Sequence, residues 1–179
     1  MKSVWKSLAP FLLGGIVSLS GVYFFNSPKH DNADSIMMYD VVGQTYYSCN
    51  IDGQQIVSEI WQQTLDERNL SDAPLLVVWF SSLGCSSCNE YVLNRTRVME
   101  ENGLPLLCFG ADFQGKPYSS ENIIYLARNE FLGLSVEELK IPFVFVYDNE
   151  VRHIFFPSSR NERAFEIYLN VVTERYGKD

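Results

Sequence analysis

A continuous apolar run followed closely by two cysteines constrains this chain more than any other feature. Leu75 to Phe80 has no polar position, as expected of a central β-strand covered on both faces. Cys85-Ser86-Ser87-Cys88 follows after a short link, and helical spacing then continues to about Glu101. This succession predicts an α/β fold in which the two cysteines stand at the amino end of a helix.

Weaker patterns complete the expected fold. A strand at 41 to 47 with a turn at 50 to 53 predicts a hairpin, and a short helix should follow it. The later order of strands and helices predicts a mixed sheet flanked by helices on both faces. The remaining elements are helices near 57–65, 120–131 and 159–176, the last with a Ser159–Glu162 capping box, and strands at 105–109, 143–147 and 151–156.

The first residues predict attachment to a membrane. Lys2 and Lys6 precede an uncharged apolar stretch from Leu8 to Phe25, whose 18 residues are at the lower limit for a spanning helix. Cleavage as a signal near Ser20 is the alternative. We expect residues 1–27 to be an anchor or signal, 28–38 a tether and 39–179 a folded α/β domain.

The positive charges near the N-terminus predict on which side of the membrane that domain lies, and membrane attachment itself can be tested. The positive-inside bias puts the N-terminus in the cytoplasm and residues after Pro28 outside the cytoplasmic membrane, in an extracytoplasmic (periplasmic) location. The full chain should then stay with membranes after a carbonate wash. Recovery of a soluble form beginning near Gly21 would instead mean that the segment is cleaved.

Composition excludes one large class of function. The net charge is −8, and no run of Lys or Arg is present. Phosphate recognition needs a clustered basic surface, so we expect no nucleic-acid partner. No nicotinamide, flavin or metal motif is visible, so we expect no cofactor.

The Cys85–Cys88 spacing has a definite chemical meaning. Two intervening residues let the sulfurs approach bonding distance within one helical turn. A helix amino end favours a thiolate over a thiol through its partial positive charge and unpaired N–H groups. We expect Cys85 to be the nucleophile and Cys88 the more buried, resolving cysteine.

Two other uses of the pair have their own requirements. A zinc half-site needs two more soft ligands, and Cys49, Cys108, His30 and His153 form no second close pair. A purely structural disulfide is compatible with an oxidising compartment.

With these residues in view, the sequence resembles the thioredoxin superfamily, in particular its membrane-attached, extracytoplasmic branch that includes reductases of cytochrome c maturation. The resemblance spans roughly residues 40 to 176. It is carried by the strand at 75–80, its spacing to the cysteine pair, the hairpin with Asp52-Gly53, and Ile141-Pro142 opening a strand.

The resemblance implies further roles. Pro142 would be a cis proline lying against the cysteines, and Ile141 would offer its backbone to an extended substrate strand. An ordinary trans proline can also open a strand. The chain departs from the family at Gly84, where a Trp is usual, and at Trp79, where many thioredoxins place a buried acid. Together with Ser86-Ser87 and with Glu90, which disfavours a thiolate, these departures leave the direction of electron flow open.

Three other residues, Cys49, Cys108 and His153, have side chains that can carry chemistry. Cys108 in an apolar strand should behave as a small hydrophobe, while a Cys49–Cys108 disulfide stays open as an alternative. His153 should share a strand face with Val151 and Phe155. Joined to the cysteines it would suggest a copper carrier, although such carriers use a wider cysteine spacing.

The sequence therefore predicts a thiol–disulfide oxidoreductase acting on protein thiols or disulfides outside the cytoplasmic membrane. The family favours the reducing direction, which would need a membrane electron donor. The competing prediction is a redox-inactive thioredoxin fold that serves as a binding module.

Overall fold

The computed structural model describes residues 49 to 70 and 74 to 177. The predicted anchor at 8–25, the tether at 28–38 and the strand at 41–47 lie outside them. Across the described ranges, no helix combines the length and apolar character needed to cross a bilayer. The elements follow as α3 (Glu59–Arg68), β1 (Leu75–Ser81), α4 (Ser86–Thr96), α5 (Val98–Glu101), β2 (Leu106–Ala111), β3 (Ile123–Tyr125), the 3-10 helix η1 (Ser135–Leu139), β4 (Phe143–Tyr147), β5 (Val151–Phe155), the 3-10 helix η2 (Ser159–Asn161) and α6 (Glu162–Tyr176).

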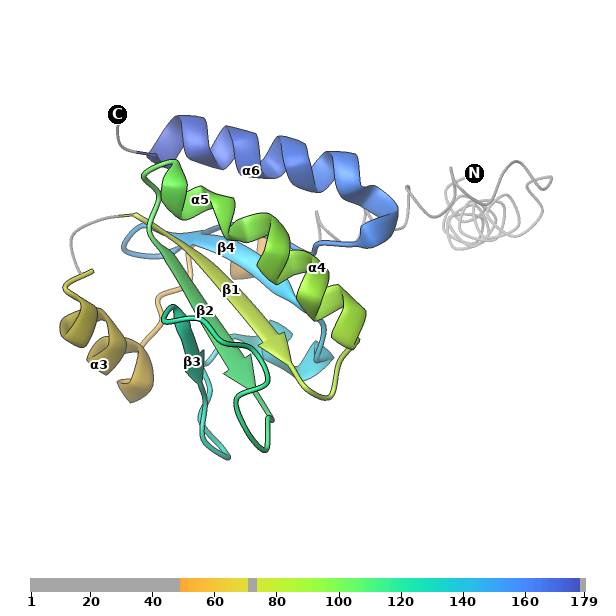
Figure 1. The fold of residues 1–179 in the computed structure, drawn as a ribbon. Helices are drawn as coiled ribbons and strands as arrows, with labels where there is room; N and C mark the ends of the chain where they lie inside the picture. The colour runs from red at the N-terminus through yellow and green to blue at the C-terminus, as the bar shows by residue number, and fades with distance from the viewer. Residues whose placement is uncertain (1–48, 71–73, 178–179) are drawn as a thin grey trace, which may run out of the picture. The chain divides into compact units, whose positions relative to one another are not determined.

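The five strands form one mixed sheet in the order β3-β2-β1-β4-β5 (Figure 1). β1 runs parallel to β2, and β2 to β3, whereas β4 is antiparallel to both β1 and β5. Ser81 pairs with Ala111, and Trp79 pairs with Phe143. Because of this register, the segments that follow β1 and β2 and the segment that precedes β4 all meet at one end of the sheet.

Two hydrophobic clusters explain why β1 is apolar from Leu75 to Phe80. Its alternate side chains Leu76, Val78 and Phe80 pack under α4, α5 and α6, which cover one face of the sheet in Figure 1. Val77 and Trp79 point to the other face, where they pack in a cluster with Trp61 of α3 and Val136 of η1. The prediction of a mixed sheet with helices on both faces is confirmed.

The last helix holds the end of the chain against the sheet. Phe165, Leu169 and Val172 recur at helical spacing within the predicted helix and are buried. The start of this helix differs from the prediction. Ser158, rather than Ser159, supplies the capping oxygen by accepting the N–H of Arg160, and the single turn η2 precedes α6.

The predicted helix at 120–131 is wrong. Ile123 to Tyr125 instead pairs in parallel with β2, so that Cys108 lies opposite Ile123. Exposed Phe131 is not part of a buried helical stripe. The open hydrogen-bonding edge of β2, together with two β-branched isoleucines, outweighs the local helical spacing.

The turn at 50–53 takes a different form from the predicted hairpin. Residues 49 to 51 are helical, and Gly53 then donates its N–H to the carbonyl of Val151 at 2.7 Å. The Asp52 carboxylate accepts the N–H groups of His153 and Ile154, each at 3.0 Å. The segment therefore packs along the outer edge of β5.

A bulge in β5 corrects a second prediction. The register of β4 with β5 shifts between Val144 and Val146, and His153 adopts a positive φ of 55°. The extra residue breaks the alternation of side chains. Val151 and Phe155 consequently pack in different clusters, on opposite faces of the sheet.

Candidate functional site

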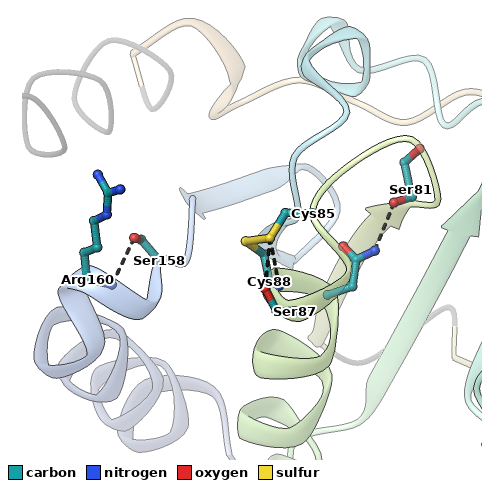
Figure 2. Close-up of a disulfide and its surroundings, with 7 residues drawn as sticks. Ser81, Cys85, Ser87, Cys88, Ser158 and Arg160 are labelled. Carbon is teal, nitrogen blue, oxygen red and sulfur yellow. Dashed lines mark hydrogen bonds between the residues drawn. A yellow bond between two sulfur atoms is a disulfide. The ribbon is translucent and has the colours of Figure 1, made fainter.

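A disulfide joins Cys85 to Cys88, with their Cα atoms 5.2 Å apart (Figure 2). This separation lies within the ordinary range for a disulfide. Cys85 is exposed and Cys88 is partly buried. The two cysteines singled out from the sequence are thus brought together, and the outer sulfur can be reached by another molecule.

Cys85 occupies the N-cap position of α4. Its backbone is extended, and its sulfur accepts the N–H of Cys88 at 3.2 Å. The same sulfur lies 3.2 Å from the hydroxyl oxygen of Ser87, as Figure 2 shows. Because a disulfide sulfur carries no hydrogen, the Ser87 hydroxyl is the donor. Both bonds would be strengthened by the negative charge of a thiolate, which the helix end also favours.

A buried amide fixes the start of this helix to the end of β1. Asn89 is only 1% exposed, and its side-chain nitrogen donates to the carbonyl of Ser81 at 2.9 Å. Its backbone N–H donates to the carbonyl of Cys85 at 3.0 Å. Asn89 was not among the predicted site residues, although a polar residue on the same helix face as Cys88 and Val92 was an available signal.

Glu90 lies on a different side of the helix start. It borders a cavity together with Tyr118. Burial raises the pKa of the Tyr118 hydroxyl, and the negative charge of Glu90 raises it further. Its charge therefore bears on the loop that follows β2.

Position 84 must be glycine for steric reasons. A Cβ added to Gly84 would lie 2.1 Å from the carbonyl oxygen of Lys140. No side chain fits in that space, so the residue before Cys85 is dictated by the segment that precedes β4. The same contact shows that this segment lies directly beside the cysteine loop.

The predicted cis bond at Pro142 is wrong, because no peptide bond of the described residues is cis. The chain turns earlier, at Lys140, whose φ of 55° is left-handed. Pro142 is buried, while Ile141 is 43% exposed. The structure thus brings this segment to the cysteines through Lys140 rather than through a cis proline.

The acid missing from β1 is not replaced by another acid on that strand. Trp79 is fully buried and stacks on Phe143, with ring centroids 5.2 Å apart. A buried carboxylate does lie in η1: Glu137 accepts the backbone N–H groups of residues 132, 133 and 134. Burial raises the pKa of Glu137, and these hydrogen bonds oppose the rise. Its bonds organise the loop before η1 rather than the cysteines.

The other candidate ligands do not gather at this site. Cys108 is 3% exposed on β2, Cys49 is exposed, and no disulfide joins the two. The ring of His153 bonds the hydroxyl of Tyr176 at 3.0 Å, at the end of α6. Among the residues that the structure describes, no three His, Cys, Asp or Glu side chains are placed to hold a metal ion.

Comparisons with models of protein families, with curated proteins and with solved structures find no match to this chain. Fold and site therefore define its class by geometry alone. It is an α/β protein that carries a surface Cys-x-x-Cys disulfide at the amino end of a helix.

Proposed function

We propose that the protein is a thiol–disulfide oxidoreductase of the thioredoxin-like type, with Cys85 as nucleophile and Cys88 as resolving cysteine. The observation that carries this proposal is the position of Cys85. Cys85 is an exposed residue at a helix N-cap, and its sulfur accepts a backbone N–H. A disulfide with a purely structural role needs neither exposure nor a setting that stabilises a thiolate.

The order in which the two cysteines react follows from their unequal exposure. In the reducing direction, the Cys85 thiolate attacks one sulfur of a substrate disulfide, and the other substrate sulfur leaves as a thiolate and is protonated. Cys88, once deprotonated, then attacks the Cys85 sulfur and releases the second substrate thiol. The substrate gains two electrons and two protons, and the Cys85–Cys88 disulfide is formed. A dithiol donor, at the membrane in this proposal, must then reduce that disulfide.

The support has two parts of unequal weight. The mixed sheet flanked by helices and the disulfide at the end of a strand–loop–helix unit favour the thioredoxin-like interpretation. The trans bond at Pro142 removes one motif on which the resemblance depended. Exposed Ile141, which follows the Lys140 carbonyl that packs against Gly84, supports a role for this segment in meeting an extended substrate in its place.

The competing function is a redox-inactive binding module. The absence of an acid at Trp79 favours it, because the Cys88 thiol then lacks a nearby proton acceptor on β1. The two functions differ in one measurable property, which is whether the pair turns over.

The test is the reduction of insulin by dithiothreitol in the presence of the full chain. The wild-type chain should accelerate precipitation of the reduced insulin, and Cys85→Ala should abolish the acceleration. Cys88→Ala should instead trap mixed disulfides that are visible on a non-reducing gel, because the resolving step is lost. Cys49→Ala, a change at an exposed cysteine outside the site, is the matched control. If wild-type protein and Cys85→Ala have the same effect, the binding module is the correct function.

A further inference from the structure

An ion pair lies behind the cysteine loop and connects the three chain segments that meet there. Asp112 directly follows β2, and one of its carboxylate oxygens lies 3.1 Å from the Lys140 ammonium. The two side chains are 32% and 29% exposed, so solvent screens the pair only in part. The Lys140 ammonium also lies 5.8 Å from the centre of the Trp79 ring.

The same carboxylate oxygen ties down the turn that leads to Cys85. It accepts the hydroxyl of Ser81 at 2.7 Å, and that hydroxyl oxygen accepts the N–H of Leu83 at 3.1 Å. The hydroxyl of Ser82 donates to the Asp112 carbonyl. Asp112 therefore holds the last residue of β1 and the residue that follows it, and its own carboxylate is held by Lys140.

Lys140 closes the connection from the other side. Its left-handed backbone directs its carbonyl at Gly84, closely enough that no side chain fits between them. The residue after Gly84 is Cys85. The side chain of Lys140 thus holds Asp112 by an ion pair, while its backbone carbonyl packs against Gly84, the residue before Cys85.

Asp112 is ionised over the neutral range. Burial opposes ionisation, but the hydrogen bonds from Ser81 and Lys140 and the charge of Lys140 outweigh it and hold the pKa of this carboxyl below its usual value. The pair is therefore a charged link rather than a neutral contact.

We propose that Asp112 and Lys140 are positioning residues that keep Cys85 at the N-cap of α4 and thereby stabilise its thiolate. This inference rests on the proposed function and deepens it. If the link is cut, the turn loosens and the Cys85 sulfur loses the N–H of Cys88 for part of the time. The pKa of the Cys85 thiol should then rise, and the disulfide should become harder to reduce.

Two single substitutions separate positioning from simple electrostatics. Lys140→Met removes a positive charge, and Asp112→Asn removes a negative charge while keeping an oxygen for Ser81. If the pair acted only through its field, the two changes would move the Cys85 pKa in opposite directions. Because we infer a mechanical link, both should raise it. The double variant should be no worse than the single variants, since the two residues share one interaction.

The measurement is the equilibrium of the full chain with reduced and oxidised glutathione, followed by the rate of Cys85 alkylation against pH. Each single variant should shift the equilibrium constant towards the disulfide by about two- to fivefold, the range expected of a partly exposed ion pair. The control is the Glu150–Arg152 pair, whose charged groups lie 2.5 Å apart on β5 and the turn before it, at the opposite end of the sheet. Glu150→Gln and Arg152→Met make the same charge changes there and should leave the constant unchanged.

The outcomes distinguish this inference from the proposed function. A lower Cys85 pKa in Asp112→Asn, an unchanged equilibrium in both site variants, or an equal shift in the Glu150 and Arg152 controls would each overturn the positioning role. If the wild-type disulfide does not equilibrate with glutathione at all, the proposed function itself fails.

Discussion

Cys85 and Cys108 place the same side chain in two opposite settings. Cys108 lies within β2, 3% exposed, and is part of the apolar cluster under α4 and α6. Cys85 is exposed, and its sulfur accepts an N–H at a helix N-terminus. Burial in apolar surroundings opposes a thiolate, whereas the helix end favours one. Reactivity in this molecule therefore depends on position and not on residue type.

The largest expected effect is on labelling of the two thiols. After reduction, a bulky maleimide should modify Cys85 at least about a hundredfold faster than Cys108, because Cys108 reacts only when the surrounding structure opens. The reagent must be too large for the small cavity that Cys108 borders with Leu93 and Ile123. Mass spectrometry of labelled peptides over time gives both rates.

The control for this comparison is the unfolded chain. In concentrated denaturant the two cysteines lose their different surroundings, so their rates should converge. A large difference that persisted there would contradict an origin in the fold.

The second effect is on stability, where we expect the larger change at Cys108 and the smaller change at Cys85. Under reducing conditions, Cys108→Ser should lower the free energy of unfolding by about 1–3 kcal/mol, because a hydroxyl is more costly than a thiol to remove from water. Cys85→Ser should change it by less than about 0.5 kcal/mol, since the site is exposed and serine is a favoured N-cap. Denaturant titration of both variants checks the comparison, and equal losses would break it.

The smallest effect concerns the hydroxyl beside the Cys85 sulfur. Ser87→Ala removes a hydrogen-bond donor 3.2 Å from the Cys85 sulfur and should raise the pKa of that thiol by about half a unit to one unit. Ser86→Ala, at the neighbouring exposed position, should leave it unchanged. The rate of alkylation as a function of pH gives the pKa, and equal values for the two variants would exclude a role for the Ser87 hydroxyl.

The elements that form because of residues close together in the sequence were predicted correctly. The apolar run at 75–80, the cysteine pair at a helix start and the stripe of α6 each depend on neighbouring residues in the sequence. β3 could not be found in this way, because Ile123 to Tyr125 is a strand only by virtue of its pairing with β2. Its own spacing resembles a helix.

The candidate site likewise contains residues that sequence spacing identifies and residues that only the fold brings together. Cys85 and Cys88 were identified from their spacing, but Asp112 and Lys140 are 28 residues apart and meet only at the end of the sheet. An aspartate directly after a buried strand was the available sign for one of them. The error at Pro142 has a related cause, since the left-handed turn at Lys140 makes the bend that a cis bond was expected to make.

The cover along β5 bears on self-association. An outer strand with open N–H and C=O groups is a template for pairing with other chains. Here Gly53 and Gln54 bond Val151, and the Asp52 carboxylate occupies the N–H groups of the β5 bulge. The opposite outer strand, β3, is only three residues long. A polypeptide chain that approaches either outer strand of the described sheet thus finds few open N–H and C=O groups with which to extend it.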